Sequence, residues 1–326
     1  MDQALNNGIF TISLDFEIHW GVSEHRTIES YSENLKNVPK VVDRLLEVFQ
    51  AFEIHSTWAT VGMLFCENQN QISNSVAKTD WPIYTNKKLS NYRLINEIGK
   101  DYEEDPYHFG LPMIEAIAKV KGQEIATHTF SHYYCLEKGQ TISNFEKDLD
   151  AAIQIADQLK FSTESIVFPR NQYNDDHLNL LHKKGIKSFR GNEMHWMYRP
   201  RSRAEETKLR KLARLIDAYF KISGDNTHLL TQKKPINIPS SRFLRPFDPR
   251  LNFLESLRLN RICNEMTYAA KHNRLYHLWW HPHNFGKHID ENFAFLKKIL
   301  EHFSNLKEKY HFQSLNMKEV VALIDG

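Results

Sequence analysis

The stretch Ile9-Phe-Thr-Ile-Ser-Leu-Asp-Phe-Glu17 gives the first indication of the fold. It is a run of strand-favouring residues that ends in two acids, Asp15 and Glu17. Side chains two residues apart in a strand point to the same face, and the carboxyl ends of strands hold the active site in parallel α/β folds. Two carboxylates at such an end can take different roles, one binding a cation and the other acting as a base. Hydrogen bonds to loop amides or to a neighbouring arginine are the simpler role for the same pair.

Strand and helix patterns alternate along the rest of the chain. Strands are predicted at 55–63, 123–127, 165–169, 186–189 and 275–280. Helices are predicted at 31–53, 111–121, 143–159, 175–184 and 290–307, the last with Asp290 as its N-cap. This alternation predicts βα units around a parallel sheet or barrel. A chain of 326 residues fits either two domains or one α/β barrel of about 250 residues with insertions.

Two polar stretches interrupt the alternation, residues 66–110 and residues 193–249, and both are predicted to be insertions. Within the second, residues 198–221 carry eight Lys or Arg against three acids, and Leu209, Leu212, Ala213, Ile216 and Phe220 fall on one helical stripe. The first interpretation is a helix packed on the main body with a solvated basic face. The second is a patch for an anionic partner, such as a sugar phosphate, a lipid-linked glycan or a membrane surface.

The composition excludes several classes of protein. Hydrophobic residues make up 41% of the chain and charged residues 25%, which is ordinary for a globular protein and excludes a mainly disordered one. The net charge of +2 argues against a nucleic-acid binder. Three scattered cysteines are too few for a disulfide framework or a cysteine-based zinc site. Residues 1–7 lack a basic segment followed by an apolar one, and no apolar run approaches 18 residues, so we expect a cytoplasmic protein without a spanning helix. The sequence carries no signal for an oligomeric state.

A histidine pair follows the predicted strand 123–127, in the run His128-Thr-Phe-Ser-His132. Its i, i+4 spacing would place two imidazoles on one side of a helical turn, within reach of one cation. With a carboxylate from another strand end they make a set of two imidazoles and one carboxylate. Such a set leaves positions open for water and substrate, as catalytic metal sites do. The same spacing also arises by chance in a chain with 17 histidines.

A further histidine, His281, follows the predicted strand 275–280. The sequence there reads His277-Leu-Trp-Trp-His281-Pro-His283-Asn284. Alternation puts Trp279 and His281 on one face of this strand. A histidine at the strand end can act as a general acid that gives a proton to a leaving amine, or it can cap backbone carbonyls at the edge of the core. The strand 165–169 ends at Arg170, which can pair with a strand-end carboxylate and keep it ionised.

Taken in chain order, these four motifs resemble those of the NodB-like polysaccharide deacetylases, carbohydrate esterase family four. The run His128-Thr-Phe-Ser-His132 matches the family's His-Ser/Thr-x-x-His motif in full, and Asp15 with Glu17 is similar to the branch whose first motif is Asp-x-Glu. The resemblance spans about residues 9–192 and 275–322.

The resemblance implies a distorted (β/α) barrel of about seven strands, formed by residues 1–326 as a single unit with the two insertions. It implies one divalent metal, usually zinc, held by Glu17, His128 and His132. The implied chemistry is removal of an N-acetyl group from an amino sugar of a polysaccharide or glycan precursor. Asp15 would act as the base that takes a proton from water, His281 as the acid that protonates the amine, and Arg170 as the residue that orients the base.

Several alternatives stay open from the sequence. The roles of Asp15 and Glu17 can be exchanged, and His283 competes with His281. The run Pro169-Arg170-Asn171-Gln172 departs from the family's Arg-x-Pro motif. Trp58, Trp279 and Trp280 suit either a sugar platform or the core. Other hypotheses are a deformylase of lipid-linked amino sugars, a ring-opening amidohydrolase and a non-catalytic glycan-binding barrel.

Overall fold

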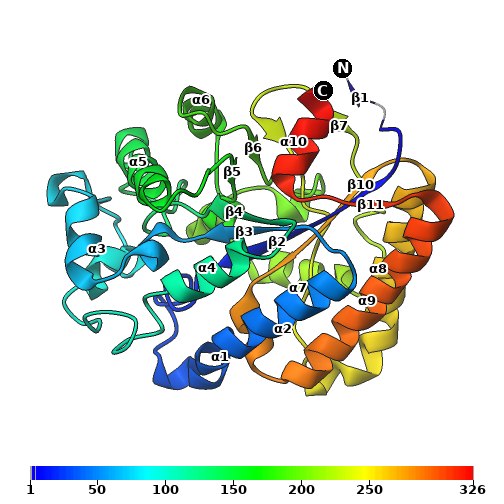
Figure 1. Cartoon of the computed structure of the whole chain (residues 1–326), viewed down its shortest axis with the longest axis horizontal. Helices are drawn as coiled ribbons and strands as arrows, with labels where there is room; N and C mark the ends of the chain where they lie inside the picture. Colours follow the sequence, from blue (N-terminus) through cyan, green and yellow to red (C-terminus); the bar gives the residue numbers. More distant parts are fainter. Residues whose placement is uncertain (1, 4, 326) are drawn as a thin grey trace.

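The computed structural model describes residues 2–3 and 5–325, and its centre is a parallel sheet (Figure 1). The strands follow one another across this sheet in the order β8-β6-β5-β4-β3-β2-β10-β9, and β11 pairs with β2. The strands are β1 Asp2–Gln3, β2 Ile9–Phe16, β3 Ser56–Thr60, β4 Gln123–Thr127, β5 Ser165–Ile166, β6 Ser188–Phe189, β7 Leu230–Thr231, β8 Ile236–Asn237, β9 Arg242–Phe243, β10 Leu275–Trp280 and β11 Gln313–Ser314. The expected α/β barrel fold is therefore confirmed, with eight described strands along this order where about seven were expected.

Helices surround the sheet, with α2, α8 and α9 along one side in Figure 1 and α5 and α6 beyond β5. The α-helices are α1 Ser32–Lys36, α2 Val38–Ala51, α3 Gln69–Ser75, α4 Leu111–Ala118, α5 Ile142–Gln158, α6 Asp175–Lys183, α7 Lys208–Asp217, α8 Glu255–Lys271, α9 Ile289–Tyr310 and α10 Met317–Asp325. The 3₁₀ helices are η1 Glu29–Tyr31, η2 Gly62–Phe65, η3 Lys78–Asp80, η4 Lys87–Leu89, η5 Asn91–Leu94, η6 Pro169–Asn171, η7 Trp196–Tyr198, η8 Arg203–Glu205, η9 Pro249–Leu254 and η10 Pro282–Gly286.

Strand β2 is buried along its whole length, because it lies between β10 and β3 near the middle of the sheet. Its even-numbered residues Ile12, Leu14 and Phe16 belong to the main hydrophobic core, which also contains the apolar face of α2. Its odd-numbered residues point to the opposite face. After Ile9 they are polar, and Ser13 and Asp15 lie inside the barrel beside a buried arginine and a buried histidine.

Two expected helix boundaries are wrong. The helix expected over 31–53 is two helices, because the chain breaks at Asn37 and Pro39 then occupies the first turn of α2, where its missing N–H costs nothing. The N-cap of α9 is His288, not Asp290. The backbone of His288 is left-handed, with φ of 54°, and Asp290 instead lies in the first turn and pairs with Arg44 at 2.6 Å.

Part of the second expected insertion belongs to the sheet, since β8 and β9 both lie within residues 193–249. These two strands stand at opposite ends of the strand order and are joined by only four residues. Ser240 N donates to Gly191 O at 2.9 Å and Ser241 N donates to His277 O at 2.8 Å, so this short segment connects the two edges of the sheet. Strand propensity along the sequence did not predict β8 and β9, because a strand of two residues forms only where neighbouring strands pair with it.

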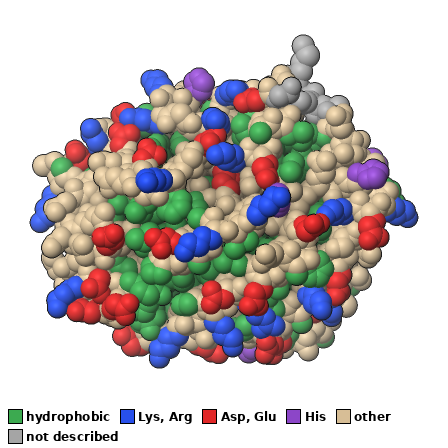
Figure 2. All heavy atoms as spheres, in the orientation of Figure 1, with side chains coloured by type: hydrophobic (Ala, Val, Ile, Leu, Met, Phe, Trp, Pro, Cys, Tyr) green, Lys and Arg blue, Asp and Glu red, His purple; other side chains and the backbone are tan. Residues whose placement is uncertain are grey.

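The face drawn in Figure 2 intersperses Lys and Arg with Asp and Glu, as expected from the small net charge. Among the residues described, none of the helices has the length and apolar composition that crossing a membrane requires.

Candidate metal and acid–base site

Three side chains that the sequence proposed as metal ligands converge at the carboxyl end of the sheet. The Oε2 atom of Glu17 lies 2.9 Å from Nε2 of His132 and 3.3 Å from Nε2 of His128. All three residues are buried, and their ligand atoms lie within 4.8 Å of one another. One carboxylate oxygen and two imidazole nitrogens at this spacing are a donor set suited to a divalent ion of the zinc type.

The surroundings of these residues fit a bound cation. His128 donates from Nδ1 to the carbonyl of Val167 at 2.8 Å, which fixes the ring and leaves Nε2 free to bind. Burial lowers the pKa of His132, which favours the neutral form that a metal needs. Glu17 has room only because residue 21 is glycine, since a Cβ on Gly21 would lie 1.9 Å from Glu17 Cδ.

The histidine pair is held by a loop, and the expected helical turn is wrong. Residues 128–132 have no helical hydrogen bonding, and Thr129 and His132 have positive φ values of 63° and 59°. Such conformations cost free energy for residues with a Cβ, so they persist only where the surroundings hold them. The buried carboxylate of Asp148 on α5 does so, accepting from Phe130 N at 2.8 Å and from both N and Oγ of Ser131.

Asp148 gives a pH-dependent prediction. Burial raises its pKa to about 6, although the hydrogen bonds from Ser131 and Phe130 oppose that rise. Its folded-state pKa thus lies above the unfolded value of about 3.9, so the ionised form weakens folding and stability falls as pH rises from about 4 to 6. We therefore compare the unfolding free energies of Asp148→Asn and wild type. We expect their difference to change in favour of the variant by up to about 3 kcal/mol as the pH rises from 4 to 7. Urea denaturation of both proteins across this range tests it. A pH-independent difference would show that Asp148 does not titrate there.

Asp15 is held by an arginine that the sequence analysis did not select. Arg190, which directly follows β6, is fully buried and binds Asp15 through two hydrogen bonds, Nη1 to Oδ1 at 2.6 Å and Nη2 to Oδ2 at 2.8 Å. It also donates to Ser13 Oγ and Asn171 Oδ1, and its guanidinium lies 4.1 Å from the centre of the Trp279 ring. Burial alone would raise the pKa of Asp15, but the charge and hydrogen bonds of Arg190, together with the nearby His128 and His281, more than offset this and lower it. Asp15 is therefore ionised at neutral pH.

The expected pairing of Arg170 with a strand-end carboxylate of the site is wrong. Arg170 instead binds Glu24 and Glu137, the latter at 3.3 Å, and its guanidinium lies over the Tyr134 ring. The physical reason is local: Arg170 and Asn171 have φ values of 54° and 51°, so the chain turns sharply after β5. This turn sends the side chain of Arg170 out toward Glu24 and brings that of Asn171 in toward Arg190.

A signal for Arg190 was present in the sequence. The run Ile186–Phe189 was predicted as a strand, and Arg190 is the next residue, so the rule that selected Arg170 applied equally to it. The partner of Asp15 depends on which strand ends lie opposite one another across the barrel. That arrangement is a property of the folded sheet and not of the motif order.

His281 and His283 occupy different environments. The Nε2 atom of His281 lies 3.5 Å from Oε1 of Glu17 and 3.7 Å from Oδ2 of Asp15, and its side chain lines a pocket. His283 is buried, lies 4.0 Å from Glu17 Oε1, and has its pKa lowered to about 3 by burial. His281 is thus the histidine of the two that a ligand in the pocket can reach.

The three candidate tryptophans also lie in different environments. Trp58 and Trp280 are fully buried, and both pack edge-on against Phe49 in the core. Trp279 lines the same pocket as His281 and packs against Phe243, with the ring centres 4.7 Å apart.

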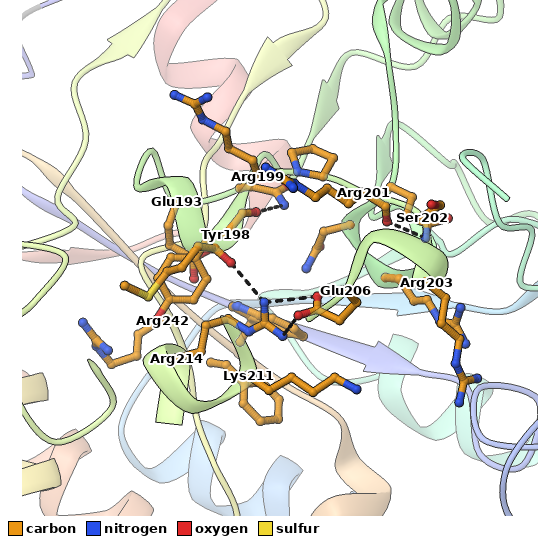
Figure 3. Close-up of a pocket in the computed structure, with 18 of the residues that line it drawn as sticks. Glu193, Tyr198, Arg199, Arg201, Ser202, Arg203, Glu206, Lys211, Arg214 and Arg242 are labelled. Atoms are coloured by element: carbon orange, nitrogen blue, oxygen red, sulfur yellow. Dashed lines mark hydrogen bonds and ion pairs between the residues drawn. The ribbon is translucent and has the colours of Figure 1, made fainter. Parts of the chain in front are cut away.

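This pocket has a volume of about 560 Å³, and most of its wall comes from residues 192–214 (Figure 3). For residues 198–221, the interpretation as a packed helix with a solvated basic face is wrong at Arg210, which is buried, whereas Leu209 and Leu212 of the apolar stripe are 69% and 51% exposed. The buried side chains of α7 are Arg210 and Asp217. Arg210 donates to the carbonyls of Met197 and Arg199, so charged hydrogen bonds rather than apolar contacts attach α7 to the loop before it.

Comparison with solved structures identifies the fold. A structure described as a "putative polysaccharide deacetylase from Mycobacterium smegmatis" aligns over 100% of this chain and 94% of its own, with a TM-score of 0.60 and 13% identity. A "probable Polysaccharide deacetylase from Pseudomonas aeruginosa PAO1" aligns over 97% and 89%, with a TM-score of 0.56 and 9% identity. PuuE allantoinase aligns over 97% and 88%, with a TM-score of 0.54 and 11% identity.

No family model matches the chain. No curated protein matches it either. At 9–13% identity the structural likeness concerns the fold. The chain therefore has the fold of the NodB-like polysaccharide deacetylases, and it carries the buried Glu17, His128 and His132 group at the carboxyl end of its sheet.

Proposed function

We propose that this protein is a metal-dependent hydrolase that removes the N-acetyl group from an amino sugar of a polysaccharide or glycan precursor. The observation that carries the proposal is the juxtaposition of two groups within one site. Glu17, His128 and His132 form a buried ligand set, and Asp15 and His281 lie directly beside it. The shared fold with polysaccharide deacetylases agrees with this chemistry.

In this proposal Glu17, His128 and His132 hold one divalent metal, with zinc the first candidate. The metal, when bound, supplies a Lewis acid for the acyl carbonyl and for a water molecule. The geometry favours Glu17 over Asp15 as the ligand, because Glu17 Oε2 faces both imidazoles whereas Arg190 occupies both oxygens of Asp15.

Asp15 is the proposed general base. Its ionised carboxylate takes a proton from the attacking water at Oδ2, the oxygen that faces His281 at 3.7 Å. His281 is the proposed general acid, and gives a proton from Nε2 to the departing amine nitrogen. Water thus adds to the acyl carbon, the C–N bond breaks, and the products are a carboxylate and an amine.

The direct test of the function is product release. Protein loaded with zinc is incubated with N-acetylated and N-formylated amino sugars, and acetate and formate are measured. We expect acetate release that stops when a chelator removes the metal, and formate as the main product would shift the assignment to a deformylase. Full metal occupancy without release of either acid from any acylated amino sugar would favour a non-catalytic, glycan-binding barrel.

The role of His281 has its own test. We expect His281→Ala to lower kcat on an N-acetyl sugar by about 10²–10⁴-fold, because the amine then leaves without a proton. Cleavage of 4-nitrophenyl acetate should fall by only a few fold, since nitrophenolate leaves unprotonated. Equal losses on both substrates would show that His281 serves structure or metal binding and not proton transfer. The control is His283→Ala, which alters the buried neighbour of His281 and is measured on the same two substrates.

A further inference from the structure

The pocket that leads to His281 is lined by more positive than negative side chains. Figure 3 shows arginines from residues 199–203 and from α7 around one cavity. Some of this charge is neutralised within the protein. Arg170 and Arg203 share Glu24, Arg214 binds Glu206 at 3.1 Å, and Arg242 binds Glu265 at 2.6 Å.

Four cations of the lining have no such partner. Within the described residues, no carboxylate lies within 4.0 Å of the side-chain nitrogens of Arg199, Arg201, Lys211 or Arg245. The remaining acid of the lining, Glu193, is buried, and burial raises its pKa, which favours its neutral form. The pocket therefore carries an excess of positive charge.

Of these four cations, Arg245 gives the strongest indication of a bound anion. Its side chain is half-buried, and its guanidinium makes no hydrogen bond among the described residues. A guanidinium that is partly removed from water without a counter-charge carries a free-energy cost. A phosphate group is the ligand whose geometry suits several arginines and a lysine at once. Surface arginines alone would not require this explanation, because water solvates them.

The lining of the pocket also contains aromatic side chains. Trp279 and Phe243 present aromatic rings beside His281, and the Trp279 and His281 ring centres lie 5.7 Å apart. Aromatic faces with a few polar groups are typical of a site for a sugar ring. One pocket thus joins a sugar-binding wall next to the reacting groups with a cationic wall formed by residues 199–214 and Arg245.

We propose that the substrate is an acylated amino sugar that carries a phosphate or diphosphate ester, and that this anion binds Arg199, Arg201, Lys211 and Arg245 while the sugar reaches His281. The inference rests on the proposed function for the reaction, but the anion site stands on its own geometry. A nucleotide and an isoprenoid lipid both supply this chemistry.

The test is binding of inorganic pyrophosphate by calorimetry, with the full chain carrying His132→Ala so that pyrophosphate cannot bind through a metal. We expect saturable binding that Arg245→Gln and Arg201→Gln each weaken by about tenfold or more, because each removes a charged hydrogen bond. Arg250→Gln is the matched control. Arg250 has an 87% exposed side chain, pairs with Asp248 and lies outside the pocket, so its loss should leave the affinity unchanged.

No saturable binding at millimolar pyrophosphate, or equal affinity in the pocket variants, would overturn the anion site. Because this measurement needs no turnover, its result is independent of whether the protein is a deacetylase. Competition then separates the sources: displacement at lower concentration by uridine diphosphate assigns a nucleotide carrier, and by farnesyl diphosphate a lipid carrier. Displacement by neither, or binding of glucuronate as tight as that of pyrophosphate, contradicts the proposal of a phosphate ester.

Discussion

The variant His132→Ala is expected to purify without a metal and to lose hydrolase activity by about 10³-fold or more, because a bound metal contributes several kcal/mol to stabilisation of the transition state. His132 supplies one of only two imidazoles in the ligand set, and its Nε2 atom lies 2.9 Å from Glu17. Without it, one imidazole and one carboxylate remain, which is too few for a catalytic zinc site. Elemental analysis of protein made without a histidine tag measures the metal per chain.

His182→Ala is the control for this experiment. His182 lies exposed in the last turn of α6, away from the site, so its removal should change neither metal content nor activity. Near-stoichiometric metal in wild type and in His182→Ala, with little in His132→Ala, supports the metal centre. Wild-type protein that binds no divalent ion even after reloading would overturn it, and with it the proposed hydrolase.

The second large effect is expected from Arg190→Gln, which should lower kcat/KM by about 10²–10⁴-fold, the range that a general base contributes. Arg190 is the charge that keeps the buried Asp15 ionised and the donor that orients both its oxygens. Without it, the pKa of Asp15 rises, so a proton occupies the base at a higher pH. The acid limb of the kcat/KM profile should therefore move to higher pH in the variant.

Arg170→Gln decides between the two arginines. Arg170 contacts Glu24 and Glu137 and not Asp15, so its removal should leave the acid limb at the wild-type position. A shift of the limb in Arg170→Gln, with none in Arg190→Gln, would reverse the assignment. Because loss of a buried charge partner destabilises by about 3–5 kcal/mol, the fold of Arg190→Gln is checked by circular dichroism. Arg190→Lys, which keeps the charge but loses the paired hydrogen bonds, separates orientation from charge.

The local sequence determined much of the structure of this protein. Alternation along residues 9–17 buries one face of β2 in the core and turns Asp15 and Glu17 to the other, because side chains in a strand alternate whatever the rest of the fold. The strand–helix order determined a parallel barrel, since a parallel strand pair needs a crossover. The His128–His132 spacing identified two residues that do meet, although through a left-handed loop held by Asp148 and not through a helix.

The contacts across the barrel depend on the tertiary structure. Asp15 and Arg190 are 175 residues apart, and they meet because the folded sheet brings the ends of β2 and β6 together across its interior, which no local pattern encodes. The same holds for β8 and β9, which are too short to form without neighbouring strands, and for α7, where buried hydrogen bonds of Arg210 outweigh the apolar stripe. The local pattern thus sets which face of the strand a side chain takes, whereas its partner depends on how the whole sheet folds.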